Sequence, residues 1–100
     1  MIYRLVKMTF KPDKVETFEA LFNRQKDSIR SFPGCEHVRL MHDLADTRVF
    51  FTFSIWQNEQ ALEAYRSSEL FEQTWAETKI LFDDRPQAWS TSVVAEGTQL

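Results

Sequence analysis

The side chains best suited to chemistry are aromatic, and four of them lie in one otherwise polar stretch, SIWQNEQALEAYRSSELFEQTW. Trp56, Tyr65, Phe71 and Trp75 each bury a large area, so they pack either into a hydrophobic core or around a flat organic molecule. Tyr65 stands apart because a buried phenol needs a hydrogen-bond partner and can serve as an acid or an anchor. Aromatic residues at helical spacing also occur in plain cores, so both interpretations stay open at this point.

Two hydroxyl residues, Thr52 and Ser54, lie just before Trp56 on a strand face that should be buried. Thr52, Ser54 and Trp56 alternate along RVFFTFSIW, so their side chains share one face of a predicted strand. Hydroxyl groups on a core face indicate a cavity with polar atoms in its wall. The alternative is that both hydroxyls bond to the local backbone.

The remaining reactive side chains are weaker candidates for catalysis or metal binding. An imidazole is the usual general base, but the predicted strand places His37 and His42 on opposite faces, with His42 beside a loop. Cys35 would share a face with His37, yet a small buried thiol is the simpler expectation. Two histidines and one cysteine fit no usual metal site, and the sequence has no glycine-rich phosphate loop. We therefore expect no metal and no nucleotide cofactor.

The segments that hold these residues follow the order β-α-β-β-α-β. Alternation with period two predicts strands over residues 1–10, 35–43, 48–56 and 87–95. Apolar residues at three- and four-residue steps predict a helix over residues 15–32, with Asp13 and Glu16 in the spacing of a capping box. A second helix is predicted from a cap at Asn58 to Phe82, with a break at the RSS tripeptide. This order is the ferredoxin-like α+β fold with an antiparallel sheet.

The two middle strands leave an apolar patch on one face of the sheet. If their turn centres on Ala45, then Val49, Phe51, Phe53 and Ile55 point away from the helices. Helices can cover only one face, and at roughly 25 cal/mol per Å2 four exposed side chains of this size represent several kcal/mol. Two sheets packed about a two-fold axis would bury them, so we expect a homodimer through the open sheet face.

Composition and charge indicate which classes of protein the chain can belong to. The chain has 100 residues, a net charge of −3 and a single cysteine, which fit one domain in a reducing cytoplasm. No basic cluster suggests a nucleic-acid partner, and no apolar run approaches the roughly 20 residues that a membrane helix needs. We predict a single domain over residues 1–95, followed by a loose tail at residues 96–100.

Three segments carry a resemblance to a known family: VKMTFKPDKVETFEALF, FPGCEHVRLMHD and FFTFSIWQNEQALEAYRSSELFEQ. Their order and spacing are similar to the antibiotic biosynthesis monooxygenase (ABM) domain family, over about residues 1 to 95. The most specific part is Trp56, then a short acidic or amide link, QALEAY, and a serine and an aromatic in SSELF. The resemblance implies a dimeric α+β barrel with a cavity between each sheet and its helices.

Family members differ in their chemistry, so the resemblance leaves the reaction open. Some oxidise polyketide phenols or quinols with oxygen and without metal or flavin, some degrade heme, and others isomerise or bind small molecules. The heme-degrading branch uses an Asn, a Trp and a His that fall at or near Val6, Tyr65 and Trp75, and this chain keeps none of these types. Heme degradation is therefore disfavoured, since an indole cannot ligate iron. The quinol-oxidising branch has a Trp that matches Trp56, whereas its pocket Asn falls at Thr52, and many relatives carry a His in place of Tyr65.

The candidate catalytic residues are Tyr65, Thr52 and Ser54. The candidate substrate-binding residues are Trp56, Phe71, Trp75 and Val6. The first hypothesis is a cofactor-independent monooxygenase for a small aromatic or quinol-type substrate, whose deprotonated form the hydroxyl donors would stabilise. The alternative is a non-catalytic dimeric protein of the same fold that binds a small hydrophobic or aromatic molecule.

Overall fold

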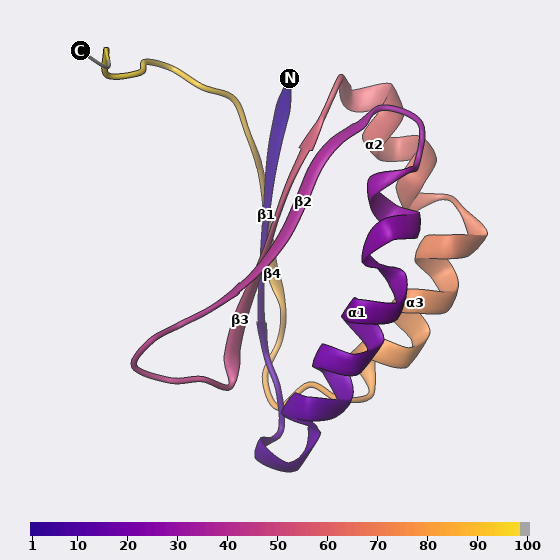
Figure 1. The fold of residues 1–100 in the computed structure, drawn as a ribbon, viewed down its shortest axis with the longest axis vertical. Coiled ribbons are helices and arrows are strands. Elements are labelled where there is room, and N and C mark those ends of the chain that lie inside the picture. Colours follow the sequence, from indigo (N-terminus) through magenta and orange to yellow (C-terminus); the bar gives the residue numbers. More distant parts are fainter. Residues whose placement is uncertain (99–100) are drawn as a thin grey trace.

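The sheet and the helices form two layers, with the α-helices gathered on one face of the sheet (Figure 1). The computed structural model describes residues 1–98. Its strands pair in the order β2-β3-β1-β4, with neighbouring strands antiparallel, which confirms the predicted ferredoxin-like α+β fold. The elements are, in chain order, β1 (Ile2–Thr9), α1 (Val15–Arg30), β2 (Cys35–His42), β3 (Val49–Trp56), α2 (Glu59–Arg66), α3 (Glu69–Lys79) and β4 (Gln87–Thr91).

The predicted capping box at the start of α1 is wrong. A short 3-10 turn over Pro12–Lys14 leads directly into the helix, so Asp13 lies inside that turn and does not cap α1. Lys14 occupies the cap position, and its side chain makes no capping hydrogen bond. The other end of α1 is closed by Ser31, whose amide bonds to the carbonyl of Asp27.

The turn from α1 into β2 depends on Gly34. Its φ of 87° lies in the left-handed region that side chains disfavour. A Cβ at this position would also collide with the Cβ of Ala61 in α2. The glycine therefore satisfies two requirements, the direction of the turn and the close approach of α2.

The second helical segment is divided into α2 and α3, as predicted. The Asn58 side chain accepts a hydrogen bond from the Ala61 amide at 2.8 Å, which confirms the predicted cap. At the break, the Ser68 hydroxyl donates to the Tyr65 carbonyl and accepts from the Phe71 amide, so it ends one helix and begins the next. The predicted extension to Phe82 is wrong, because α3 ends at Lys79 and Phe82 forms an isolated β-bridge with Phe10.

The hairpin register confirms the predicted sorting of faces. Thr52 lies opposite Leu40 on one side and Val6 on the other, so these residues share the helix-facing side of the sheet. The turn centres near Asp46 instead of Ala45, and this shift moves the pairing by two residues, which leaves the faces unchanged.

The predicted common face of Cys35 and His37 is wrong. A bulge between them lets Cys35 pair with Trp56 while His37 pairs with Ile55. The thiol is consequently buried beside Trp56 and Leu62, whereas the imidazole lies on the open face against Phe53.

Two hydrophobic clusters fill the two ends of the layer between sheet and helices. One surrounds Phe10, which stacks on Phe18 at a ring-centroid distance of 4.1 Å and also contacts Phe50. The other contains Trp56, which is 1% exposed, together with Cys35 and Leu62. Along β3 these clusters are anchored at Phe50 and Trp56, so Thr52 and Ser54 lie between them.

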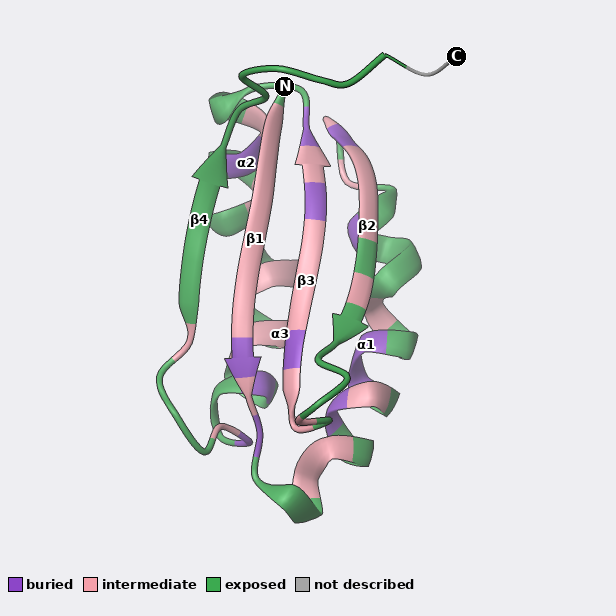
Figure 2. Ribbon diagram, turned by 90° about the vertical axis from the view of Figure 1, so that its left-hand side faces the viewer, coloured by how far each residue is buried: buried purple, intermediate pink, exposed green. Residues whose placement is uncertain are grey.

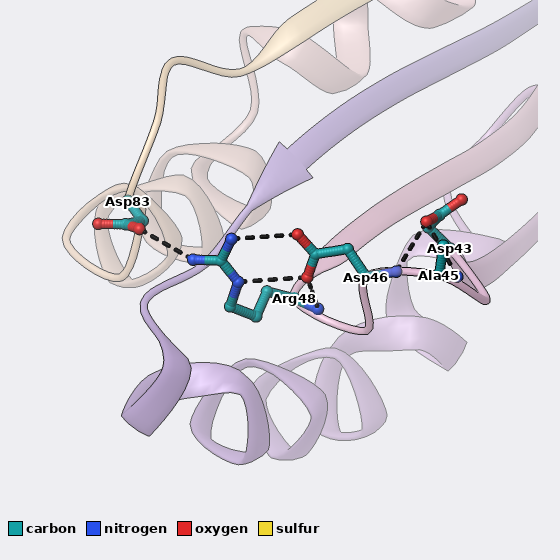
Figure 3. A network of polar contacts seen from close by, with 5 residues as sticks. All are labelled: Asp43, Ala45, Asp46, Arg48 and Asp83. Carbon is teal, nitrogen blue, oxygen red and sulfur yellow. Dashed lines mark hydrogen bonds and ion pairs between the residues drawn. The ribbon is translucent and has the colours of Figure 1, made fainter.

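A polar network fastens the hairpin loop to the segment after α3 (Figure 3). The Arg48 guanidinium contacts a carboxylate oxygen of Asp46 at 3.0 Å and one of Asp83 at 3.2 Å. Asp43 accepts hydrogen bonds from the amides of Ala45 and Asp46 within the loop. The network fixes the chain ahead of β4, the strand that completes the sheet.

β4 is shorter than the predicted strand over residues 87–95. Its last pair is Thr91 with Tyr3, and β1 begins only one residue earlier, so residues 94–98 lie beyond the end of β1. Residues 92–98 form neither helix nor strand and extend away from the sheet (Figure 1). The predicted tail at residues 96–100 thus lies partly within this segment, and residues 99–100 lie outside the described residues.

The face of the sheet away from the helices is uncovered (Figure 2). The outward side chains of β3, Val49, Phe51, Phe53 and Ile55, are all partly exposed. Trp89 of β4 is 44% exposed on the same face, opposite Leu5. Among the helices of residues 1–98, none has the length and apolar character needed to cross a bilayer.

Candidate functional site

A cavity of about 400 Å3 lies between the sheet and the helices. This volume is within the range of about 300 to 1,000 Å3 that is typical of small-molecule sites. The wall is mainly apolar and is formed by all four strands on one side and by the three α-helices on the other. It occupies the middle of the layer, between the Phe10 and Trp56 clusters.

The structure brings together all seven residues that the sequence singled out for a site. The sheet contributes Val6, Thr52, Ser54 and Trp56 to the cavity wall, and the helices contribute Tyr65, Phe71 and Trp75. It is a structural finding that all seven residues line the same cavity. Their division into catalytic and substrate-binding residues remains a prediction.

The aromatic residues form a continuous wall. Tyr65 stacks on Trp56 at a centroid distance of 4.9 Å and meets the edge of Phe71 at 5.3 Å. Phe71 in turn lies parallel to Trp75, with 7° between the ring planes. Trp56 and Tyr65 also pack in the hydrophobic cluster around Leu62, so the same rings serve the core and the cavity.

The two hydroxyl residues on β3 differ in their surroundings. Ser54 lines the cavity, and its Oγ accepts a hydrogen bond from the indole Nε1 of Trp56 at 3.0 Å instead of bonding to the local backbone. This bond uses the oxygen of Ser54 and leaves its hydrogen available to a ligand. Thr52 lies next to it on the same face, between Val6 and Leu40 in the sheet.

Tyr65 is suited to donate a hydrogen bond and not to act as a base. Burial, with a smaller contribution from Cys35, raises the pKa of Tyr65 to about 12. The phenol therefore keeps its proton throughout the physiological pH range. Tyr65, on α2, could therefore donate a hydrogen bond to a ligand oxygen in the cavity.

Sequence reasoning missed two arginines in the cavity wall. Arg4 projects from β1 on the helix-facing side, and Arg66 ends α2. The signal for Arg4 was available, because it is the one charged residue in the alternating set of Ile2, Val6, Met8 and Phe10. Arg66 had no comparable signal, since a basic residue in the last turn of a helix is also a common helix terminus.

A third missed residue is Thr74 on α3. Thr74 lines the cavity wall, while its Oγ1 is buried and has no hydrogen-bond partner among the described residues. The neighbouring Thr78 hydroxyl donates to the Thr74 carbonyl at 2.7 Å and so does not satisfy that side chain. An unpaired buried hydroxyl is unfavourable, so Thr74 adds a polar group beside the otherwise apolar wall of α3.

Other reactive groups lie away from this cavity. His37 accepts a hydrogen bond from Arg39 Nε on the open sheet face, and His42 lines a separate hollow between α1 and β2. Burial raises the pKa of the Cys35 thiol, which makes it a weak nucleophile. Within residues 1–98, no three His, Cys, Asp or Glu side chains come close enough together to hold a metal ion.

Comparison with known proteins points to one family. The family model described as "Antibiotic biosynthesis monooxygenase" matches residues 1–77. An uncharacterized protein of Synechocystis is 33% identical over 63 residues, which is 63% of this chain and 43% of that protein. The matched region thus spans less than half of this relative's length.

Solved structures share the fold. A crystal structure of an antibiotic biosynthesis monooxygenase has a TM-score of 0.89 at 18% identity, covering 95% of this chain and 100% of its own. The structure of Rv0793 from Mycobacterium tuberculosis has a TM-score of 0.87 at 16% identity, covering 97% and 98%. At these identities the likeness establishes the fold alone.

Proposed function

The chain belongs to the antibiotic biosynthesis monooxygenase family, and from this premise we propose that it is a cofactor-independent monooxygenase for a small aromatic phenol or quinol. The observation that carries the proposal is the composition of the cavity wall. Stacked aromatic rings lie beside hydroxyl groups in one largely apolar cavity. A flat, electron-rich substrate would fit such a wall better than a sugar or a nucleotide.

The reaction would draw its electrons from the substrate. In the simplest case a hydrogen-bearing ring carbon of a phenol bonds to one atom of O2, the O–O bond breaks, and the second oxygen leaves as water. The phenol loses two hydrogens and becomes a quinone, so the substrate supplies the four electrons that reduce O2. Loss of the phenol proton comes first, because the phenolate is the form that gives up electrons readily.

The cavity residues would favour that phenolate. Tyr65 and the hydroxyls of Thr52 and Ser54 can each donate a hydrogen bond to an oxyanion. Trp56, Phe71 and Trp75 would hold the ring, and Val6 would add apolar contact from β1. Exclusion of water from this space would strengthen each of these interactions.

The alternative, a non-catalytic binding protein of the same fold, is favoured by one observation. Among the described residues that line the cavity there is no carboxylate and no imidazole to remove a proton. Tyr65 keeps its own proton, so it does not fill that role. A binding protein would need only the aromatic wall and the polar positions.

We further propose that the chain functions as a homodimer through the open sheet face. The outward residues of β3 and Trp89 of β4 form an apolar surface that no helix of the described chain covers. A second copy of this face would bury it about a two-fold axis. The partner would also stiffen the sheet that forms the floor of the cavity.

Oxygen consumption distinguishes the two functions. The purified protein is mixed with a panel of hydroquinones and naphthols, and O2 uptake is followed together with incorporation of labelled oxygen into the product. A monooxygenase should consume O2 in equal amount to the quinone formed and place one labelled atom in it. Folded protein that binds members of the panel without O2 uptake would establish the binding protein instead.

A further inference from the structure

The cavity wall has a charge opposite to that of the whole chain. The net charge of the sequence is −3, yet within the described residues the charged groups of the wall are Arg4 and Arg66 alone. A mainly apolar space with two cations is an unusual environment, because charged side chains are rarely placed in such a wall without a partner.

Arg4 has no ion pair among residues 1–98. Its Nη1 donates a hydrogen bond to the neutral Ser90 Oγ at 2.9 Å, across the β1–β4 pair. Burial, and then the nearby charge of Arg66, lower the pKa of Arg4, although a guanidinium stays charged at neutral pH. A cation that is partly removed from water beside a second cation is destabilising unless an anion joins them.

Arg66 stands at the mouth of the same cavity. Its side chain is 47% exposed, and its nearest carboxylate oxygen, on Glu63, lies 3.8 Å away. That distance is too long for a good hydrogen bond, so most of the donor groups of Arg66 remain available. The two arginines therefore share one cavity wall with little charge compensation from the described protein.

Thr74 places a further polar group at the cavity, on the side of the helices. Its buried Oγ1 has no partner in the part of the chain that the structure describes. It projects from α3, on the opposite side of the cavity from Arg4 on β1. Polar groups therefore occur on both sides of the cavity, and the charged ones are on β1 and at the end of α2.

We propose that the ligand of this cavity is an aromatic carboxylate, with Arg4 as the binding residue for the carboxylate and Arg66 as a second cation at the mouth. Guanidinium and carboxylate groups match in shape as well as in charge, since two N–H groups can donate to two oxygens. The inference rests on the proposed function for the identity of the cavity as the substrate site, and it adds the class of substrate. It does not require turnover.

A purely structural role for Arg4 would make a different prediction. The bond to Ser90 connects β1 to β4, and a neutral donor would serve that purpose equally well. Replacing Arg4 with Gln keeps a donor at this position and removes the charge. Ligand charge preference then separates the two roles.

The test uses two probes with the same ring system, the naphthoate anion and the neutral naphthylmethanol. Binding is measured by calorimetry on wild type, Arg4→Gln and Arg66→Gln, with Arg24→Gln as a control that removes the same charge from the outer surface of α1. We expect wild type to prefer naphthoate by about tenfold or more, the size of one charge-assisted hydrogen bond. Arg4→Gln should lose that preference, Arg66→Gln should reduce it, and Arg24→Gln should retain it. Added salt should weaken naphthoate binding only.

Equal binding of the two probes by wild type would overturn the inference, as would an unchanged preference in Arg4→Gln. If Arg4→Gln fails to fold, Arg66→Gln and the wild-type salt dependence decide the matter. The proposed reaction is judged separately by O2 uptake. Selective naphthoate binding without O2 uptake on any phenol would refute the monooxygenase and leave the carboxylate site standing.

Discussion

The indole Nε1 of Trp56 donates a hydrogen bond to the hydroxyl of Ser54, two residues earlier on the same face of β3, at 3.0 Å. A buried indole needs an acceptor, and here the strand supplies its own. The bond explains why a serine stands in a position that would otherwise suit an aliphatic residue. It also fixes the orientation of an indole that forms part of the cavity wall.

Ser54→Ala should destabilise the protein by about 1 to 3 kcal/mol, because the buried indole N–H loses its acceptor. Thr52→Ala is the matched control, since it removes a hydroxyl from the same face without leaving Trp56 unpaired. Urea denaturation gives both free energies of unfolding. Equal losses in the two variants would show that the Ser54–Trp56 bond contributes nothing specific.

Stability should fall with pH between about pH 10 and about pH 12 because of Tyr65. Its pKa is raised from 10.0 to about 12, so in this window the unfolded chain loses the proton while the folded protein keeps it. The contribution is complete below pH 10 and declines as the pH rises, by an amount of the order of 2 to 3 kcal/mol. Urea denaturation of wild type and Tyr65→Phe across this range measures it. A decline of the same size in Tyr65→Phe would assign it to other groups.

Phe53→Asp should abolish the dimer and leave an aggregate or an unstable monomer. The change places an unpaired carboxylate at the proposed sheet–sheet contact, which costs several kcal/mol unless the interface opens. Thr52→Ala, one residue away on the opposite face, should remain dimeric. Size-exclusion chromatography with light scattering compares the two, and a stable Phe53→Asp dimer would place the interface elsewhere.

Gly34→Ala should destabilise the fold by more than about 1 kcal/mol, because the new Cβ is disfavoured at positive φ. It would also meet the Cβ of Ala61, so the double variant Gly34→Ala with Ala61→Gly should recover the steric part of the loss. Thermal unfolding of the wild type, the two single variants and the double variant tests this, since Ala61→Gly alone weakens α2. Strictly additive losses of the two single variants would mean that strain at φ is the whole effect.

The strand faces were predicted correctly because moving the centre of the turn by one residue shifts the pairing by two. A shift of two keeps every side chain on the same face of the sheet. The turn was misplaced from Asp46 to Ala45, yet a shift of two in pairing kept Thr52, Ser54 and Trp56 on the correct face. The seven site residues reach one cavity for the same reason, since four of them follow from strand alternation and three from helical spacing.

The errors have a different origin, in contacts between distant segments. The bulge that separates Cys35 from His37 depends on how β2 meets the end of β3. The last turn predicted for α3 was lost because Phe82 pairs with Phe10 across the sheet edge. Arg66 and Thr74 line the cavity because α2 and α3 pack over the sheet, and no local sequence pattern marks such a position.

The division of the hydrophobic interior into two end clusters has a consequence for how this chain can evolve. Phe10 and Trp56 carry the packing at the two ends, so a position between them such as Thr52 contributes less to holding the molecule together. Substitutions at Arg4 or Thr52 can change what the cavity accepts at a small cost in stability. New specificities are then accessible by single steps from a fold that stays intact.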